Sequence, residues 1–104
     1  MWLFSVKGFV SIVADESHPG MLLVRGRFAG DVENLFPDAK VKKTPNRDYR
    51  FRASVARAEV ADRLVDLVSE INYSNFKDQI EDYAHHDAYF NVWRAMWNAQ
   101  NHGR

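Results

Sequence analysis

The spacing of apolar residues changes near residue 57, and this change constrains the fold more than any other feature of the chain. Before that point the apolar residues occur in short β-favouring runs bounded by turn formers, at residues 2–6, 9–14, 21–28 and 49–55. After it, apolar residues recur three and four positions apart, which is typical of amphipathic helices. Strands followed by helices in one short chain predict an α+β fold.

The predicted elements follow one another in the order β-β-β-α-β-α-α. Helices are predicted at Val32–Phe36, where Gly30-Asp31 offers a cap and Pro37 a stop, and at Ala58–Ile71, Phe76–Tyr83 and Tyr89–Gln100. We therefore expect a two-layer sandwich, in which helices cover one face of an antiparallel sheet of about four strands. A ferredoxin-like variant is the alternative if the first two runs form one bent strand.

Length and composition favour a single domain over residues 1–104. A chain of 104 residues without cysteine has neither disulfides nor thiolate metal ligands, and this size can bury a core without them. No signal-peptide pattern and no apolar run of about 20 residues is visible. The sequence thus predicts a cytoplasmic protein without a membrane partner.

Charge divides along the same boundary as the apolar pattern. Residues 1–57 hold ten Lys or Arg and six Asp or Glu, whereas residues 58–104 hold four and eight, so that a formal +4 precedes a formal −4. Opposite charge on separate elements indicates separate polar surfaces.

A basic surface is predicted on the sheet. If Val6 pairs with Phe9 and Ala14 with Met21, one face carries Trp2, Phe4, Val6, Phe9, Val13, Leu22, Val24 and Phe28, joined by Tyr49, Phe51, Ala53 and Val55. The other face then carries four arginines, which we call the arginine face: Arg25, Arg27, Arg50 and Arg52. Guanidinium groups bind phosphates and carboxylates through paired hydrogen bonds, although a solvated sheet face is often charged as well.

Two helical surfaces are further candidates for binding another macromolecule. The acidic helix places Asp62, Asp66 and Glu70 on one side, as a mimic of a phosphate backbone would. The aromatic helix carries Tyr89, Trp93 and Trp97, which suit either the core or an interface, including that of a homodimer.

No motif indicates a metal, a cofactor or a catalytic group. His85 and His86 are adjacent, so they point about 100° apart on a helix and do not converge on one ion. Asp82 and His86 are four residues apart, and a helical hydrogen bond or a helix-end interaction explains this spacing more simply than a metal ion does. The glycines form neither a dinucleotide-binding nor a P-loop motif, and no serine lies in a nucleophile elbow.

Several segments resemble a family of small bacterial and phage proteins that is uncharacterised. The similar segments span most of the chain and are the opening MWLFSVKGFVSIV, LLVRGRF, DYRFRASV, INYSNFKD and YFNVWRAMW. The resemblance implies an intracellular globular domain. It assigns no activity and no catalytic residue.

Taken together, these features predict a non-catalytic binding or regulatory protein that acts through a macromolecular interface. A protein is the favoured partner, and nucleic acid is the alternative. A concrete version is a phage-type, anti-CRISPR-like inhibitor of nucleic-acid machinery, whose acidic helix competes with nucleic acid. The alternatives are a nucleic-acid-binding module that uses the arginine face and a small enzyme with a composite site.

Overall fold

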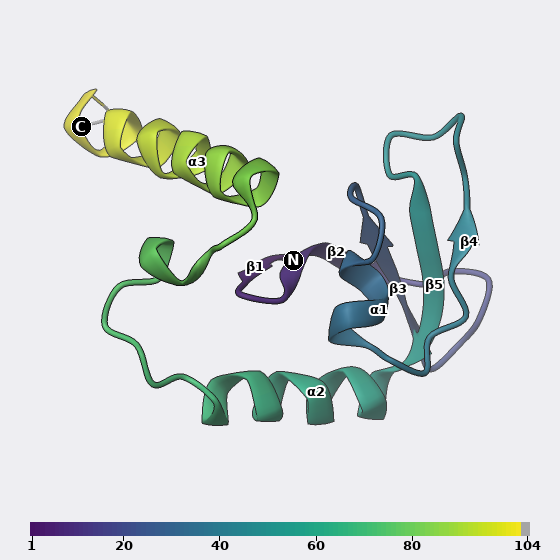
Figure 1. The fold of residues 1–104 in the computed structure, drawn as a ribbon. Helices are drawn as coiled ribbons and strands as arrows, with labels where there is room; N and C mark the ends of the chain where they lie inside the picture. Colours follow the sequence, from purple (N-terminus) through teal and green to yellow (C-terminus); the bar gives the residue numbers. More distant parts are fainter. Residues whose placement is uncertain (103–104) are drawn as a thin grey trace. The chain divides into compact units, whose positions relative to one another are not determined.

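The computed structural model describes residues 1–102. Contacts divide the chain into two compact units, Met1–Ile71 and Asn72–Arg104, and each is described by itself. The first unit contains a β-sheet and two helices, and the second contains a short 3₁₀ helix and one long helix (Figure 1). The α+β class predicted from the sequence is therefore confirmed, while the single domain over 1–104 stays a prediction.

A five-stranded antiparallel sheet forms the first unit. Its strands are β1 (Trp2–Ser5), β2 (Gly8–Ala14), β3 (Met21–Gly26), β4 (Lys42–Lys43) and β5 (Phe51–Ala56). They lie in the order β1-β2-β3-β5-β4, and all neighbours are antiparallel. The first two runs are separate strands, so the condition for a ferredoxin-like variant is not met. The short strand β4 adds a fifth member to the four strands that were predicted.

Two helices form the core with this sheet. Figure 1 shows one of them against the strands and the other leading away from the end of β5. The short helix α1 (Asp31–Leu35) follows Gly30, whose φ of 92° suits a residue without a side chain, and it ends before Pro37 as predicted. The longer helix α2 (Arg57–Ser69) turns its Val60 inward. The buried core consists of Val10, Ile12, Val24, Val32, Leu35, Phe36, Ala53, Val55 and Val60.

The register between β2 and β3 differs by one residue from the predicted one. Ala14 pairs with Leu22 rather than with Met21. A shift of one residue exchanges the faces of a strand, because side chains alternate with a period of two. Val10 and Ile12 therefore face the core with Val24, and this gives the two helices an unbroken apolar surface to cover.

The same shift moves the aromatic residues of the first hairpin. The prediction that Trp2, Phe4, Phe9 and Val13 share the core face with Leu22 and Val24 is wrong. Trp2 pairs with Ser11, and Ser11 pairs with Arg25, so these residues lie on the face opposite the helices. Aromatic and basic side chains thus share one face of the sheet.

The buried face of helix α2 is narrower than the spacing of its apolar residues predicts. Leu64 and Leu67 pack against the core, but Val68 and Ile71 are exposed. The helix ends at Ser69, so Ile71 lies beyond its last turn.

The second unit contains the 3₁₀ helix η1 (Lys77–Gln79) and the helix α3 (Tyr83–His102). The predicted division into helices at Phe76–Tyr83 and Tyr89–Gln100 is wrong, because one helix runs through the intervening residues. Asp82 begins it by accepting a hydrogen bond from the backbone N–H of His85 at 2.9 Å. The Asp82 carboxylate also lies 2.6 Å from His85 Nδ1, so its side-chain partner is His85 and not His86.

A close contact fixes the first hairpin to α1. Asp31 is buried, and its Oδ2 accepts a hydrogen bond from the backbone N–H of Phe9 at 2.9 Å. Gly8 has a φ of 145°, and a Cβ at this position would lie 2.6 Å from Cγ of Asp31. The hairpin and the helix can approach this closely only because residue 8 has no side chain.

We expect Gly8→Ala to lower the free energy of unfolding by about 2 kcal/mol or more, since it combines backbone strain with displacement of the Asp31 carboxylate. Gly20→Ala is the matched control, because Gly20 also has a positive φ of 81° but nothing lies within 4 Å of its added Cβ. Urea denaturation of both variants measures the difference. Equal losses of stability would contradict the role of the Asp31 contact.

Candidate functional site

A row of side chains crosses the open face of the sheet, opposite the helices. The pairing of strands places one residue from each of them at the same level, in the order Trp2, Ser11, Arg25, Arg52 and Lys42. Since neighbouring strands lie about 4.8 Å apart, the row spans roughly 19 Å. Arg25 and Arg52 are direct partners across β3 and β5, so they share this face, and their role at an interface stays a prediction.

Tyr49 holds the centre of this face. Its ring lies 4.5 Å from the guanidinium carbon of Arg25 and 4.1 Å from that of Arg27, and the residue is 3% exposed. The prediction that Tyr49 joins Phe51 on the apolar face is wrong, because β5 begins only at Phe51 and the alternation does not extend back to residue 49. A guanidinium over an aromatic ring gains about 0.5–2 kcal/mol, which stabilises this placement.

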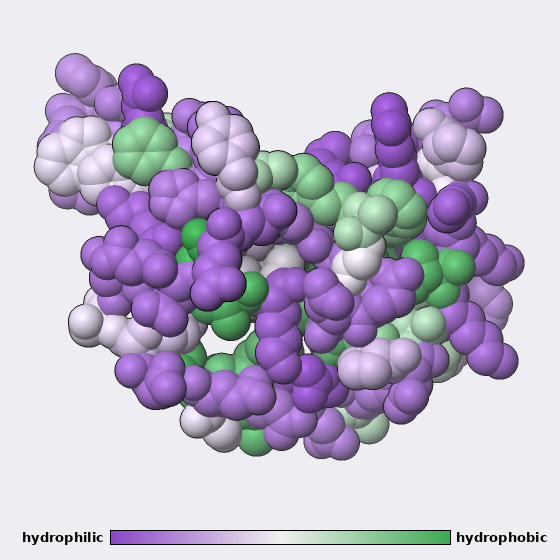
Figure 2. Space-filling model, in the orientation of Figure 1, coloured by the Kyte–Doolittle hydropathy of each residue, from purple (hydrophilic) through white to green (hydrophobic). Residues whose placement is uncertain are grey.

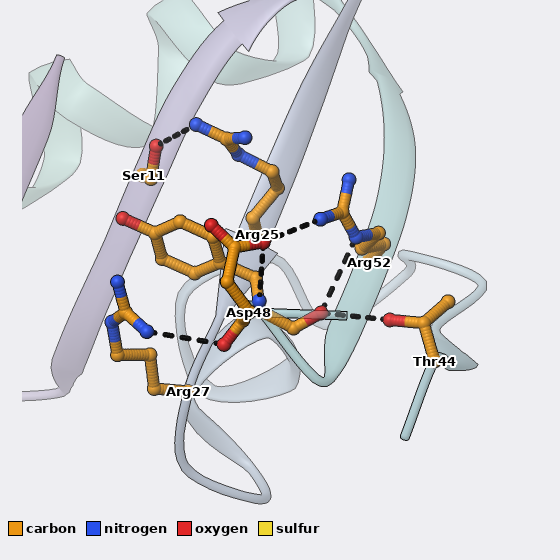
Figure 3. Close-up of polar contacts among 7 residues, drawn as sticks. Ser11, Arg25, Arg27, Thr44, Asp48 and Arg52 are labelled. Atoms are coloured by element: carbon orange, nitrogen blue, oxygen red, sulfur yellow. Dashed lines mark hydrogen bonds and ion pairs between the residues drawn. The ribbon is translucent and has the colours of Figure 1, made fainter. Parts of the chain in front are cut away.

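Asp48 connects Tyr49 to the arginines (Figure 3). Its Oδ1 accepts hydrogen bonds from the backbone N–H of Tyr49 at 2.8 Å and from Arg52 Nη2 at 3.1 Å. Its backbone oxygen accepts one from Arg27 Nη1 at 3.0 Å. The Tyr49 hydrogen bond, followed by the charges of Arg52, Arg25 and Arg27, lowers the pKa of Asp48 despite an opposing effect of burial.

Further hydrogen bonds fix the positions of the side chains around this carboxylate. The backbone oxygen of Tyr49 accepts hydrogen bonds from Thr44 Oγ1 at 2.7 Å and from Arg52 Nε at 3.3 Å. Arg25 Nη2 donates to Ser11 Oγ at 2.7 Å. Three guanidiniums are therefore held in place before any ligand binds, which reduces the entropy lost on binding.

Positive charge exceeds negative charge in this region. Residues 40–52 contain six Lys or Arg residues and a single acidic one, Asp48. Burial lowers the pKa of Arg52, and the neighbouring charges of Arg47 and Arg25 lower it further. Arg25 Nε is buried without a hydrogen-bond partner among the described residues. Such a cluster favours the approach of an anion that relieves the repulsion.

Arg50 and Arg27 are the exposed members of the arginine face. Arg50 lies just before β5, and its backbone oxygen accepts a hydrogen bond from Thr44 N–H at 2.6 Å. Its side chain has no ion pair within residues 1–102. Of the four predicted arginines, Arg25 and Arg52 are thus partly buried, whereas Arg27 and Arg50 are exposed.

An aromatic patch adjoins the basic cluster at the β1 edge, and the sequence prediction missed its role. Trp2 is 66% exposed and packs edge-on against Phe9 at 6.1 Å, while Phe4 stacks on Phe9 at 4.5 Å. Trp2 stands beside Ser11, which holds Arg25. The correct register of β2 and β3 is the signal that would have placed these rings beside the arginines.

The acidic helix is partly neutralised by neighbouring cations. Asp66 lies 3.0 Å from Arg63 and Glu70 lies 3.7 Å from Lys7, whereas Asp62 is exposed and forms no ion pair among the described residues. Exposed valines, Val65 and Val68, are interspersed with these acids along α2. Its surface is therefore a mixture of apolar and paired acidic groups, and mimicry of a phosphate backbone by this helix stays a prediction.

The three aromatic residues predicted for the last helix have different environments. Tyr89 is buried and stacks on Phe76 at 5.6 Å. Trp93 and Trp97 are exposed and stack on each other at 5.6 Å. Of these three predicted residues, the two tryptophans are therefore available to a partner and Tyr89 is not.

Within residues 1–102, no group of three or more His, Cys, Asp or Glu side chains could hold a metal ion. Over the same residues, none of the helices is long and apolar enough to cross a membrane. Comparisons with protein-family models, with curated proteins and with solved structures each returned no match. The resemblance to small bacterial and phage proteins therefore stays a prediction, as does the cytoplasmic location.

We expect the stabilising effect of Asp48 to be lost in acid. Because the pKa of Asp48 is lowered in the folded protein, its contribution is present above the ordinary value of 3.8 and disappears as the pH falls through the folded value. Melting temperatures of the parent protein and Asp48→Asn should therefore differ at about pH 6 and converge as the pH falls through the folded-state pKa of Asp48. Asp62→Asn is the control, because the Asp62 carboxylate is exposed and forms no ion pair among the described residues, and it should leave the melting temperature nearly unchanged. A difference between parent and Asp48→Asn that is independent of pH would contradict this assignment.

Proposed function

We propose that this protein is a non-catalytic binding protein that acts through a macromolecular interface, and that its arginine face binds single-stranded nucleic acid. One observation carries the proposal: an exposed tryptophan and three cationic side chains occupy a single row across the open sheet face. The row begins at Trp2 and continues through Arg25 and Arg52 to Lys42.

The chemistry of a single strand suits this row. Phosphate groups form charge-assisted, paired hydrogen bonds with guanidinium groups, and unstacked bases stack on exposed aromatic rings. Trp2 offers such a ring at one end, and Arg27, Arg50 and Lys42 offer exposed cations further along. A duplex hides its bases from this kind of stacking, so we expect a preference for single strands.

A net charge of zero for the whole chain does not weigh against this proposal, because binding responds to the local field. The basic residues are concentrated between residues 40 and 52, whereas two of the four acids between residues 59 and 70 are paired, Asp66 with Arg63 and Glu70 with Lys7. The inhibitor with an acidic helix and the small enzyme remain alternative predictions.

Reversing the exposed arginines should weaken binding and its salt dependence. We expect Arg27→Glu combined with Arg50→Glu to weaken binding to a labelled oligodeoxythymidine of about 12 nucleotides by more than about tenfold. The slope of log affinity against log salt should fall by about 1–2. Fluorescence anisotropy at several salt concentrations measures both quantities.

Arg57→Glu is the matched control for this experiment. Arg57 is exposed at the start of α2, outside the arginine face. Its substitution changes the charge by as much as each of the two substitutions in the double variant does. We expect it to leave affinity nearly unchanged. Failure of the parent protein to bind the oligonucleotide at about 50 mM salt would overturn the proposed function, since electrostatic binding is strongest at low salt. The acidic helix would then be the next candidate for the interface.

The contribution of Trp2 can be separated from that of charge. Trp2→Ala should weaken binding to the same oligonucleotide by about tenfold, because one stacked base is lost, while the salt slope stays unchanged. Trp2→Phe should retain most of the affinity, and Tyr83→Ala, which removes an exposed ring from the second unit, should retain all of it. Equal affinities for the parent protein and Trp2→Ala would exclude stacking at this position.

A further inference from the structure

Helix α3 carries a stripe of exposed aromatic side chains at heptad spacing. Tyr83, Phe90, Trp93 and Trp97 are 83%, 37%, 44% and 50% exposed. Successive rings stack along the helix, Phe90 on Trp93 at 6.0 Å and Trp93 on Trp97 at 5.6 Å. Pale and green side chains are visible among purple ones along this helix in Figure 2. Phe90, Trp93 and Trp97 thus form a continuous aromatic surface on a helix of 20 residues, and Tyr83 lies one heptad before Phe90.

We propose that this stripe is the seam of an antiparallel helix pair, formed with α3 of a second copy of this chain. In the heptad abcdefg, Tyr83, Phe90 and Trp97 occupy a, and Trp93 occupies d together with His86 and Gln100. In an antiparallel pair each a position meets a d position of the other helix. Phe90 then packs against the partner's Trp93, which places the largest rings at the centre.

Charge complementarity identifies a second copy as the occupant. Asp87 and Arg94 both occupy e positions, which flank the seam, and neither belongs to an ion pair within the part of the chain that the structure describes. When Phe90 lies opposite the partner's Trp93, Asp87 lies opposite the partner's Arg94. The twofold symmetry of the pair repeats this ion pair, so one helix supplies both halves of its own complement.

The same charges disfavour a parallel arrangement. In a parallel pair, each g position lies beside the e position five residues further along the other helix. Asp82 would then lie beside the partner's Asp87, and two like-charged contacts would flank the seam. The antiparallel arrangement avoids this contact, so the charges select orientation as well as partner.

The seam is small, and this predicts a weak dimer. With aromatic side chains of roughly 150–250 Å² each, the exposed parts of the stripe amount to roughly 320–540 Å² per copy. A total of roughly 640–1,070 Å² lies below the usual range of stable interfaces. Lys77 Nζ lies 4.4 Å from the centre of the Trp93 ring and borders the seam. We therefore expect a dissociation constant in the micromolar range or above. This expectation does not depend on the proposed binding of nucleic acid.

Sedimentation velocity of the full-length protein over a range of concentrations tests the association. We expect a concentration-dependent dimer, which Trp93→Ala weakens by more than about tenfold because it removes a ring at the centre of the pair. Val92→Ala is the control, since Val92 is exposed on the same helix but occupies an outer c position. A monomer at all concentrations, or equal weakening by the two substitutions, would overturn the proposal.

Exchange of the two charges tests the ion pair directly. Arg94→Asp places two aspartates opposite each other, and Asp87→Arg places two arginines opposite each other, so each should weaken the dimer several-fold. The double variant carries both changes and restores opposite charges across the seam. Its affinity should therefore return toward that of the parent protein. Additive weakening in the double variant would exclude the pairing of residues 87 and 94.

Cysteine cross-linking tests the orientation, because the chain contains no cysteine of its own. Tyr83 and Gln100 lie opposite each other in the antiparallel pair and at opposite ends of the helix. Mixing Tyr83→Cys and Gln100→Cys proteins under mild oxidation should give disulfides mainly between the two variants. Disulfides formed mainly within each variant would indicate a parallel pair and would overturn the proposed arrangement.

Discussion

The pairing of Ser11 with Arg25 is the constraint on which the first unit depends. Because side chains alternate along a strand, this register decides at once which residues enter the core and which remain on the open face. It turns Val10, Ile12 and Val24 toward α1 and α2. It also places the Ser11 hydroxyl where it accepts a hydrogen bond from Arg25. A core and a basic surface therefore result from the same set of backbone hydrogen bonds.

Like charges remain close together on this surface because each guanidinium has a different kind of partner. Arg25 binds Ser11, Arg27 binds the backbone oxygen of Asp48, and Arg52 binds the Asp48 carboxylate. The Tyr49 ring interacts with two of them without adding negative charge. The cluster is consequently ordered but not neutralised, and the remaining positive field is the physical basis for binding an anion.

The sequence predicts features with short-range causes better than features that depend on distant residues. Gly30 and Pro37 bound α1 as expected, because the start and the end of a helix are decided within a few residues. The register across residues 15–20 differs because a turn of that length can be closed in more than one way, and only burial of the whole face selects among them. The continuity of α3 was missed because Asp82 caps it through His85, one residue from the predicted partner.

The sequence predicts which residue types form the candidate sites better than it predicts where their side chains lie. Four arginines and two tryptophans could be named from the sequence, but the roles of Trp2 and Tyr49 follow from where the register and the end of β5 place their rings. Total charge is equally uninformative, since the chain sums to zero while residues 40–52 keep a large excess of cations. The acids that balance this sum lie largely on α2 and in the second unit, and several of them are occupied by local partners such as Arg63 and His85. A ligand responds to the nearby charges that remain unneutralised, so the local arrangement on each unit, and not the composition of the chain, decides what this protein can bind.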